Sequence, residues 1–259
     1  QMHLIVGGDS DIGMAISDNW NNNNIPFHAS TRRISLISDE RPYIDLSDEN
    51  SIINTNFAYD VAIITAGVTS IDKCERNPEE TRNINVVNTS LLINKLHSQG
   101  AYVMFLSSNQ VFDGSRPFRK STDSKNPINE YGKQKSEVED VMLPLKYKCI
   151  LRMTKVFDKN PKIIQQWKKK ILRMEEIHPF SDMLLAPVDI DIVLERINDI
   201  VSKRDTGIYH LASGVDITYE ELSRNLCNSI SGDQRLIKPV EYSSVLRNGV
   251  HYPYYTSLS

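Results

Sequence analysis

The chain has 259 residues, enough for one large domain with a substantial hydrophobic core. Its 30 lysine and arginine residues balance 33 aspartate and glutamate residues without a long block of one sign, which argues against nucleic acid as a partner and favours a small molecule. The 3 cysteines are too few and too widely spaced for a disulfide framework or a metal cluster, and no apolar run has membrane-spanning length, so we expect a cytoplasmic protein without a metal or a membrane partner.

The N-terminal segment predicts a strand, a tight turn and a helix. Residues 4–6 are apolar, residues 7–13 have the spacing G-x-x-S-x-x-G, and a helical pattern follows. Glycines at such a turn let the backbone approach a pyrophosphate, whose charge is met by free amides at the helix N-terminus. A plain strand-to-helix connection is the alternative. We expect a dinucleotide cofactor here, bound by Gly7, Ser10, Asp11, Ile12 and Gly13.

A second strand is predicted at residues 25–29, and Thr31, Arg32 and Arg33 follow it. An acidic residue at this place binds the ribose hydroxyls of NAD, whereas guanidinium groups beside a hydroxyl suit the 2′-phosphate of NADP. The sequence therefore favours NADP over NAD. A solvated basic loop is the alternative interpretation.

Two more strands are predicted at residues 43–46 and 61–65, and we expect them to end near the cofactor. A helix is predicted from about residue 78 to residue 99, and Asn85 on it is either a contact to the sheet end or the cofactor, or an ordinary polar helix position. At the strand ends, a carboxylate beside an apolar residue can meet the adenine, and small residues leave room for a cofactor to pass. These cofactor contacts are expected at Asp45, Leu46, Ala66 and Gly67.

A strongly apolar segment at residues 101–106 predicts a buried strand that ends at Ser107 and Ser108. On the helix that should follow, Tyr131 and Lys135 are four residues apart and share one face. An ammonium beside a phenol stabilises the phenolate, so we expect Lys135 to lower the pKa of Tyr131. Tyr131 then becomes a general acid, with Ser108 holding a substrate oxygen. The alternative is an exposed helix pair without a catalytic role.

Strands and helices alternate over about 150 residues, which predicts an α/β fold: a Rossmann-type, doubly wound parallel sheet with helices on both faces. Ligands bind at the carboxyl ends of such strands, where the glycine turn, Ala66 and Ser108 all fall. We expect a dinucleotide-binding domain at residues 1–158. A small C-terminal α/β substrate-binding part should occupy residues 159–259, with some of its segments returning to the large sheet.

The C-terminal part predicts further helices and one strand. A basic face at residues 168–170, on a helix at about 161–174, either meets substrate phosphates or is simply solvated. Asp191 is expected to cap the next helix, and the spacing at residues 218–221 predicts a capping box. We expect His210, inside an apolar strand, to be a hydrogen-bonded structural histidine.

These positions resemble the extended short-chain dehydrogenase/reductases, and within them the dTDP-4-dehydrorhamnose reductase group. The likeness runs from residue 4 to about residue 222, and the resemblance implies catalytic roles for Ser108, Tyr131 and Lys135. It also implies cofactor contacts from Ser107, Tyr131 and Lys135. Its most specific pieces are SSNQVFDG at residues 107–114, NPINEYGKQK at 126–135, ILR at 150–152 and GIYH at 207–210.

The resemblance implies an NADP-dependent reductase of a nucleotide-linked 4-keto sugar. Asn109 and Gln110 stand where related 4,6-dehydratases carry an acid/base pair, and because amides do not exchange protons at neutral pH, dehydration is not expected. Lys155 stands where the family commonly has an aromatic residue near the sugar. An NAD-dependent epimerase and a non-catalytic NAD(P)-binding regulatory subunit are the alternatives, and a homodimer is one possible assembly. The substrate contacts are expected at Ser108, Asn109, Gln110 and Lys155.

Overall fold

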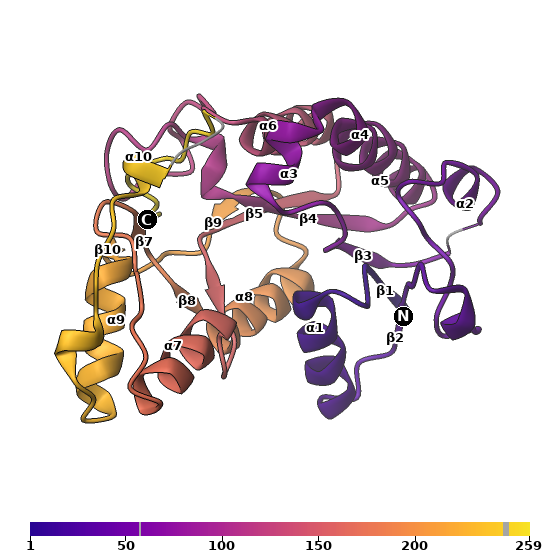
Figure 1. The fold of residues 1–259 in the computed structure, drawn as a ribbon. Helices are drawn as coiled ribbons and strands as arrows, with labels where there is room; N and C mark the ends of the chain where they lie inside the picture. The colour runs from indigo at the N-terminus through magenta and orange to yellow at the C-terminus, as the bar shows by residue number, and fades with distance from the viewer. Residues whose placement is uncertain (57, 246–248) are drawn as a thin grey trace.

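The computed structural model describes residues 1–56, 58–245 and 249–259, and its centre is a parallel sheet with helices on both faces (Figure 1). The strand order is β2-β1-β3-β4-β5-β9, and every pair in this sheet is parallel. The predicted α/β, doubly wound fold is therefore confirmed. The strands are β1 (His3–Val6), β2 (Phe27–Ala29), β3 (Val61–Ile64), β4 (Tyr102–Ser108), β5 (Lys148–Met153) and β9 (Gly207–His210).

Both faces of the sheet are buried because its strands are apolar at successive positions. In β4, Tyr102 and Met104 pack into one core cluster with Trp20, whereas Val103 and Phe105 pack into a second cluster on the opposite face. Helices α1 (Asp11–Asn22) and α8 (Ile190–Lys203) cover the first face (Figure 1). Helices α5 (Thr89–Ser98) and α6 (Glu130–Met142) cover the second, so the strand ends are held from both sides.

The remaining helices are short or belong to the C-terminal part. The helix predicted at residues 78–99 is continuous but has three pieces, with a π-helical segment between two α-helical ones. The bounds are α2 (Asn50–Ile53), α3 (Ile71–Arg76), α4 (Pro78–Arg82), the π-helical segment (Asn83–Asn88), α7 (Lys162–Leu172), α9 (Tyr219–Ser229), α10 (Tyr242–Val245) and the 3₁₀ turns Ile34–Leu36, Asn109–Val111 and Gln234–Leu236.

Two local expectations are wrong. The segment at residues 43–46 is not a strand: Tyr43 forms a single parallel bridge with Thr31, and the backbone then turns because the Ser51 hydroxyl accepts a hydrogen bond from the Asp45 amide at 3.0 Å. The cap of α8 is Asp189 rather than Asp191, because the Asp189 carboxylate accepts the amide hydrogen of Asp191 at 2.8 Å. The strand predicted at residues 43–46 is thus reduced to the single bridge between Thr31 and Tyr43 at the edge of the sheet.

The C-terminal part adds two small sheets beside the large one. One pairs β6 (Val156–Phe157) with β8 (Val188–Asp189), and the other pairs β7 (Leu184–Leu185) with β10 (Ile217–Thr218). The capping box predicted at the start of α9 is present. The division of the chain at residue 158 stays a prediction. In the described part of the chain, no helix combines the length and the apolar character needed to cross a membrane.

Candidate active site

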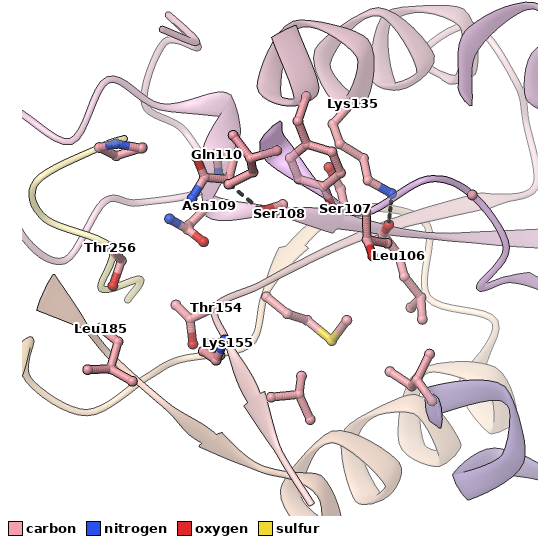
Figure 2. Close-up of a pocket in the computed structure, with 18 of the residues that line it drawn as sticks. Leu106, Ser107, Ser108, Asn109, Gln110, Lys135, Thr154, Lys155, Leu185 and Thr256 are labelled. Atoms are coloured by element: carbon pink, nitrogen blue, oxygen red, sulfur yellow. Dashed lines mark hydrogen bonds between the residues drawn. The ribbon is translucent and has the colours of Figure 1, made fainter. Parts of the chain in front are cut away.

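A cavity of about 580 Å³ lies at the carboxyl ends of β1, β3, β4 and β5 (Figure 2). A second cavity of about 370 Å³ lies beside it and shares Ser10, Ala66 and Gly67 with it. Most of the site residues predicted from the sequence line one or both of these cavities. The first is lined by Ser10, Asp11, Ile12, Ala66, Gly67, Ser107, Ser108, Asn109, Gln110, Tyr131, Lys135 and Lys155, and the second by Gly7, Ser10, Arg32, Asp45, Leu46, Ala66 and Gly67.

The glycine turn is closed by Ser10, which caps α1. Its hydroxyl donates to the Gly7 carbonyl at 2.8 Å and accepts from the Gly13 amide at 3.0 Å. Gly7 has a φ of +93°, and a Cβ on Gly13 would lie 2.1 Å from the Gly7 carbonyl oxygen, so only glycine fits these two positions. The turn therefore brings the N-terminus of α1 to the cavity wall at Asp11, where its amides can meet an anion.

The predicted basic loop behaves differently at its two arginines. The carboxylate of Asp9 accepts hydrogen bonds from Thr31 at 2.5 Å and from Arg33 at 3.0 Å, and Arg41 also donates to it. Partial burial alone would raise the pKa of Asp9, but the hydrogen bonds from Arg33, Thr31 and Arg41 lower it to about 2. Arg33 is thus paired with a carboxylate, whereas Arg32 lines the smaller cavity. Sequence reasoning did not identify Asp9, although it lies inside the glycine turn.

Tyr131 and Lys135 are positioned by the start of α6. The side chain of Asn129 caps this helix by accepting the Gly132 amide at 2.8 Å, and a Cβ on Gly132 would lie 2.1 Å from the Gln110 carbonyl oxygen. Helix α6 therefore packs directly against the turn that follows β4. Lys135 Nζ donates to the Leu106 carbonyl at 3.0 Å (Figure 2). It also lies 5.6 Å from the centre of the Tyr131 ring.

The expected lowering of the Tyr131 pKa is wrong for this structure. Burial raises the pKa of Tyr131, the nearby Cys74 adds to the rise, and a hydrogen bond with Ser108 only partly opposes it. Burial also lowers the pKa of Lys135 to about 8, against the opposing effects of Glu139 and Cys74. The phenol is therefore protonated at neutral pH, which is the form that a proton donor needs.

Several polar groups at the cavity differ in whether they are already paired. Ser107 Oγ and Asn109 Nδ2 are buried and have no hydrogen-bond partner among the residues that the structure describes, so both are available to a ligand. Asn85 is fully engaged instead. It donates to the Val68 carbonyl at 2.9 Å and to Gln134 at 2.8 Å, and it accepts the Val68 amide at 2.8 Å. Asn85 thereby fixes the loop after β3, and its contact with a cofactor stays a prediction.

The far wall of the cavity comes from segments that sequence reasoning missed. Tyr219, at the start of α9, and Tyr252 and Thr256, in the C-terminal tail, all line it. Asp216 fixes the tail by accepting hydrogen bonds from the Thr256 amide and hydroxyl, both at 2.8 Å. The sequence carried two signals: the capping box placed the start of α9, and the tyrosines at residues 252–255 indicated that the tail docks by aromatic burial.

A buried ion pair joins β5 to α6. Arg152 of β5 donates to Glu139 of α6 at 2.6 Å, and the two side chains are 2% and 1% exposed. Arg152 also contacts His210 Nε2 at 3.2 Å, while His210 Nδ1 lies 3.0 Å from the Arg119 carbonyl oxygen. Burial and the neighbouring Arg152 lower the pKa of His210 to about 4. His210 is therefore a neutral structural histidine, as predicted.

Comparison with known proteins agrees with this geometry. Residues 2–259 match the family model of the RmlD substrate binding domain. The chain is similar to a dTDP-4-dehydrorhamnose reductase of Sinorhizobium fredii, with 26% identity over 78% of this chain and 73% of that protein. It is also similar to methionine adenosyltransferase 2 subunit beta of Bos taurus, with 30% identity over 54% of this chain and 42% of that protein. Among solved structures, the dTDP-4-dehydrorhamnose reductase of Bacillus anthracis in complex with NADP has a TM-score of 0.87 at 17% identity, covering 100% of this chain and 90% of that one.

Proposed function

The chain belongs to the RmlD substrate binding domain family, and on that premise we propose that it is an NADP-dependent reductase of a nucleotide-linked 4-keto sugar. The observation that carries the proposal is the shared cavity: Ser108, Tyr131 and Lys135 line the same space as the glycine turn. The family model and the similarity to the Sinorhizobium fredii reductase confirm the resemblance to the extended short-chain dehydrogenase/reductases. A homodimer and a cytoplasmic location are further predictions that accompany this proposal.

The residues around the cavity fit a dinucleotide. The glycine turn and the N-terminus of α1 suit the pyrophosphate, and the buried hydroxyl of Ser107 lacks a partner among the described residues. Arg32, at the smaller cavity, suits the 2′-phosphate. When bound, NADPH supplies the hydride that a keto carbon needs.

The chain's own residues supply the proton and the orientation. Ser108 holds the keto oxygen beside Tyr131, whose protonated phenol donates to that oxygen as it becomes an alkoxide. The ammonium of Lys135 stabilises the phenolate that remains, because it lies 5.6 Å from the centre of the buried Tyr131 ring. Asn109 and Gln110 offer amides only, so they bind the sugar without exchanging protons.

The test is oxidation of NADPH in the presence of a panel of 4-keto sugars linked to dTDP or UDP. Turnover that depends on one panel member supports the proposal, and the identity of that member names the substrate. Protein that purifies with stoichiometric NAD and shows no net redox change during turnover would instead indicate an epimerase. Absence of turnover with every member would contradict the proposed reductase.

A regulatory subunit is the second candidate, and the similarity to methionine adenosyltransferase 2 subunit beta favours it. Such a protein would bind the cofactor and form a stable complex with another enzyme. The presence of Ser108, Tyr131 and Lys135 in one cavity favours the reductase. Cofactor binding without any reduction, together with a hetero-complex in pull-down experiments, would decide for the regulatory role.

Replacing Arg32 with alanine is expected to weaken NADPH binding selectively. Arg33 is paired with Asp9, so Arg32 is the guanidinium left to meet a 2′-phosphate. Loss of one charge-assisted hydrogen bond should raise the Kd for NADPH about tenfold or more and leave the Kd for NADH nearly unchanged. The effect should shrink as salt rises because Arg32 is exposed. Equal weakening of NADH, or an equal effect of the exposed control Arg116→Ala, would show that the assignment is wrong.

The reductase rate is expected to fall at alkaline pH. Burial lowers the pKa of Lys135 to about 8, so its ammonium is present below that pH and is lost as the pH rises through it. Without the ammonium, the phenolate formed at Tyr131 is not neutralised. The measurement is kcat from about pH 6 to about pH 10, with Lys135→Arg as the comparison, because a guanidinium stays charged over this range. A wild-type rate that stays constant up to about pH 10 would contradict the assigned role of Lys135.

A further inference from the structure

Lys155 lines the cavity, where the sequence predicted a substrate contact, and the proposed proton transfer does not use it. It follows β5, two residues after Met153, and Met153 is the register partner of Ser108. Its own carbonyl accepts the Val188 amide at 2.8 Å, so its backbone is fixed. Figure 2 draws Lys155 beside Thr154, on the side of the cavity away from Lys135. A cation therefore lines the same cavity as Ser108 and Tyr131, on a backbone that is fixed.

The ammonium of Lys155 lacks a counter-charge. No residue in the described ranges forms a hydrogen bond or an ion pair with it, whereas the neighbouring Thr154 donates to the Ala186 carbonyl at 2.5 Å. Although the side chain is exposed overall, the cavity walls partly desolvate its ammonium and lower its pKa. An ammonium that no carboxylate in the described ranges neutralises can pair with an anion that enters the cavity.

The charged residues that line the cavity also favour an anion at Lys155. Its cationic lining residues are Lys135 and Lys155, and its acidic lining residue is Asp11, at the cofactor end. Lys135 is already bonded to the Leu106 carbonyl. An anionic substrate group that enters beyond Ser108 therefore meets Lys155 as the available cation of this wall.

We propose that Lys155 binds an anionic oxygen group of the substrate and thereby determines which nucleotide-sugars the cavity accepts. This proposal rests on the proposed reductase function and adds a specificity residue to it. The anionic oxygens have two possible sources, the diphosphate of the nucleotide and a carboxylate on the sugar ring. Both fit the same chemistry, a charge-assisted hydrogen bond from a lysine ammonium.

The test measures binding, so its result is independent of turnover. Dissociation constants are determined by calorimetry for UDP, UDP-glucose and UDP-glucuronate, and for the dTDP counterparts, with wild type, Lys155→Met and Lys155→Arg. The matched control is Lys168→Met, which removes an exposed ammonium from α7, outside the cavity. Lys155→Met should raise the Kd about tenfold or more for the ligands that carry the anion bound by Lys155. Lys155→Arg should retain most of the affinity for them.

The pattern of losses identifies the source of the anion. An equal loss for the free nucleoside diphosphate and both sugars assigns the diphosphate, whereas a loss confined to the glucuronates assigns a carboxylate on the sugar. Unchanged binding of all ligands by Lys155→Met, or wild-type protein that binds none of them, would overturn the proposal. Thermal melting of each variant shows whether the fold is intact. A protein that shows these losses but reduces no 4-keto sugar would sustain the role of Lys155 and contradict the reductase alone.

Discussion

Replacing Tyr131 with phenylalanine is expected to lower kcat of the reductase about 10²- to 10⁴-fold. The change removes one hydroxyl and keeps the ring, which is only 8% exposed, so the packing of α6 should persist. The raised pKa of Tyr131 keeps that hydroxyl protonated at neutral pH, and its loss removes the phenol that we assign to protonate the new alkoxide. The measurement is the steady-state rate of NADPH oxidation with the substrate found in the panel.

The matched control for this variant is Tyr147→Phe, which removes a phenol from an exposed side chain that lies outside the cavity. Its kcat should equal that of the wild type. Dissociation constants for NADPH and the nucleotide-sugar should change little in Tyr131→Phe, because the lost interaction belongs mainly to proton transfer. Unchanged kcat in Tyr131→Phe would mean that the proton comes from another group.

Much of this site was predictable because its signals are local in the sequence. The apolar strand that ends at Ser108 and the four-residue spacing of Tyr131 and Lys135 each lie within one segment. The glycine turn likewise follows directly from an apolar strand and precedes a helix. Parallel strands then place these segments at one edge of the sheet without further information.

The errors arise where residues distant in the sequence decide the outcome. The pKa of Tyr131 depends on how completely the surrounding chain removes water from it, and that burial outweighs the hydrogen bond with Ser108. The pairing of Arg33 depends on Asp9, which lies 24 residues earlier. Neither the degree of burial nor this ion pair has a periodic pattern that a sequence could reveal.

The C-terminal wall illustrates the same limit. Tyr252 and Thr256 lie in a tail without helical or strand periodicity, and Asp216, 40 residues before Thr256, holds that tail in place. Side-chain hydrogen bonds of this kind have no counterpart in local propensity. The sequence therefore predicted a substrate-binding part at residues 159–259 without naming these cavity-lining residues, and their contact with a substrate stays a prediction.

The largest effect on stability is expected from Arg152→Met. This change leaves the Glu139 carboxylate 1% exposed without its main counter-charge, and breaking one partner of a buried ion pair costs about 3–5 kcal/mol. The free energy of unfolding in urea is the measurement. The control Arg82→Met breaks a pair between exposed side chains, Arg82 and Glu137, and should cost no more than about 1 kcal/mol.

The pH dependence of the Arg152→Met defect distinguishes a lost charge from lost packing. Burial already raises the pKa of Glu139, and Arg152 opposes that rise, so removing Arg152 should raise the pKa further. Glu139 then becomes protonated as the pH falls, and the stability difference from wild type should shrink at lower pH. The double variant Arg152→Met with Glu139→Met, which removes both charges, should recover much of the loss. A defect that is constant with pH and undiminished in the double variant would mean that Arg152 stabilises the fold through packing on Phe112 instead of through its charge.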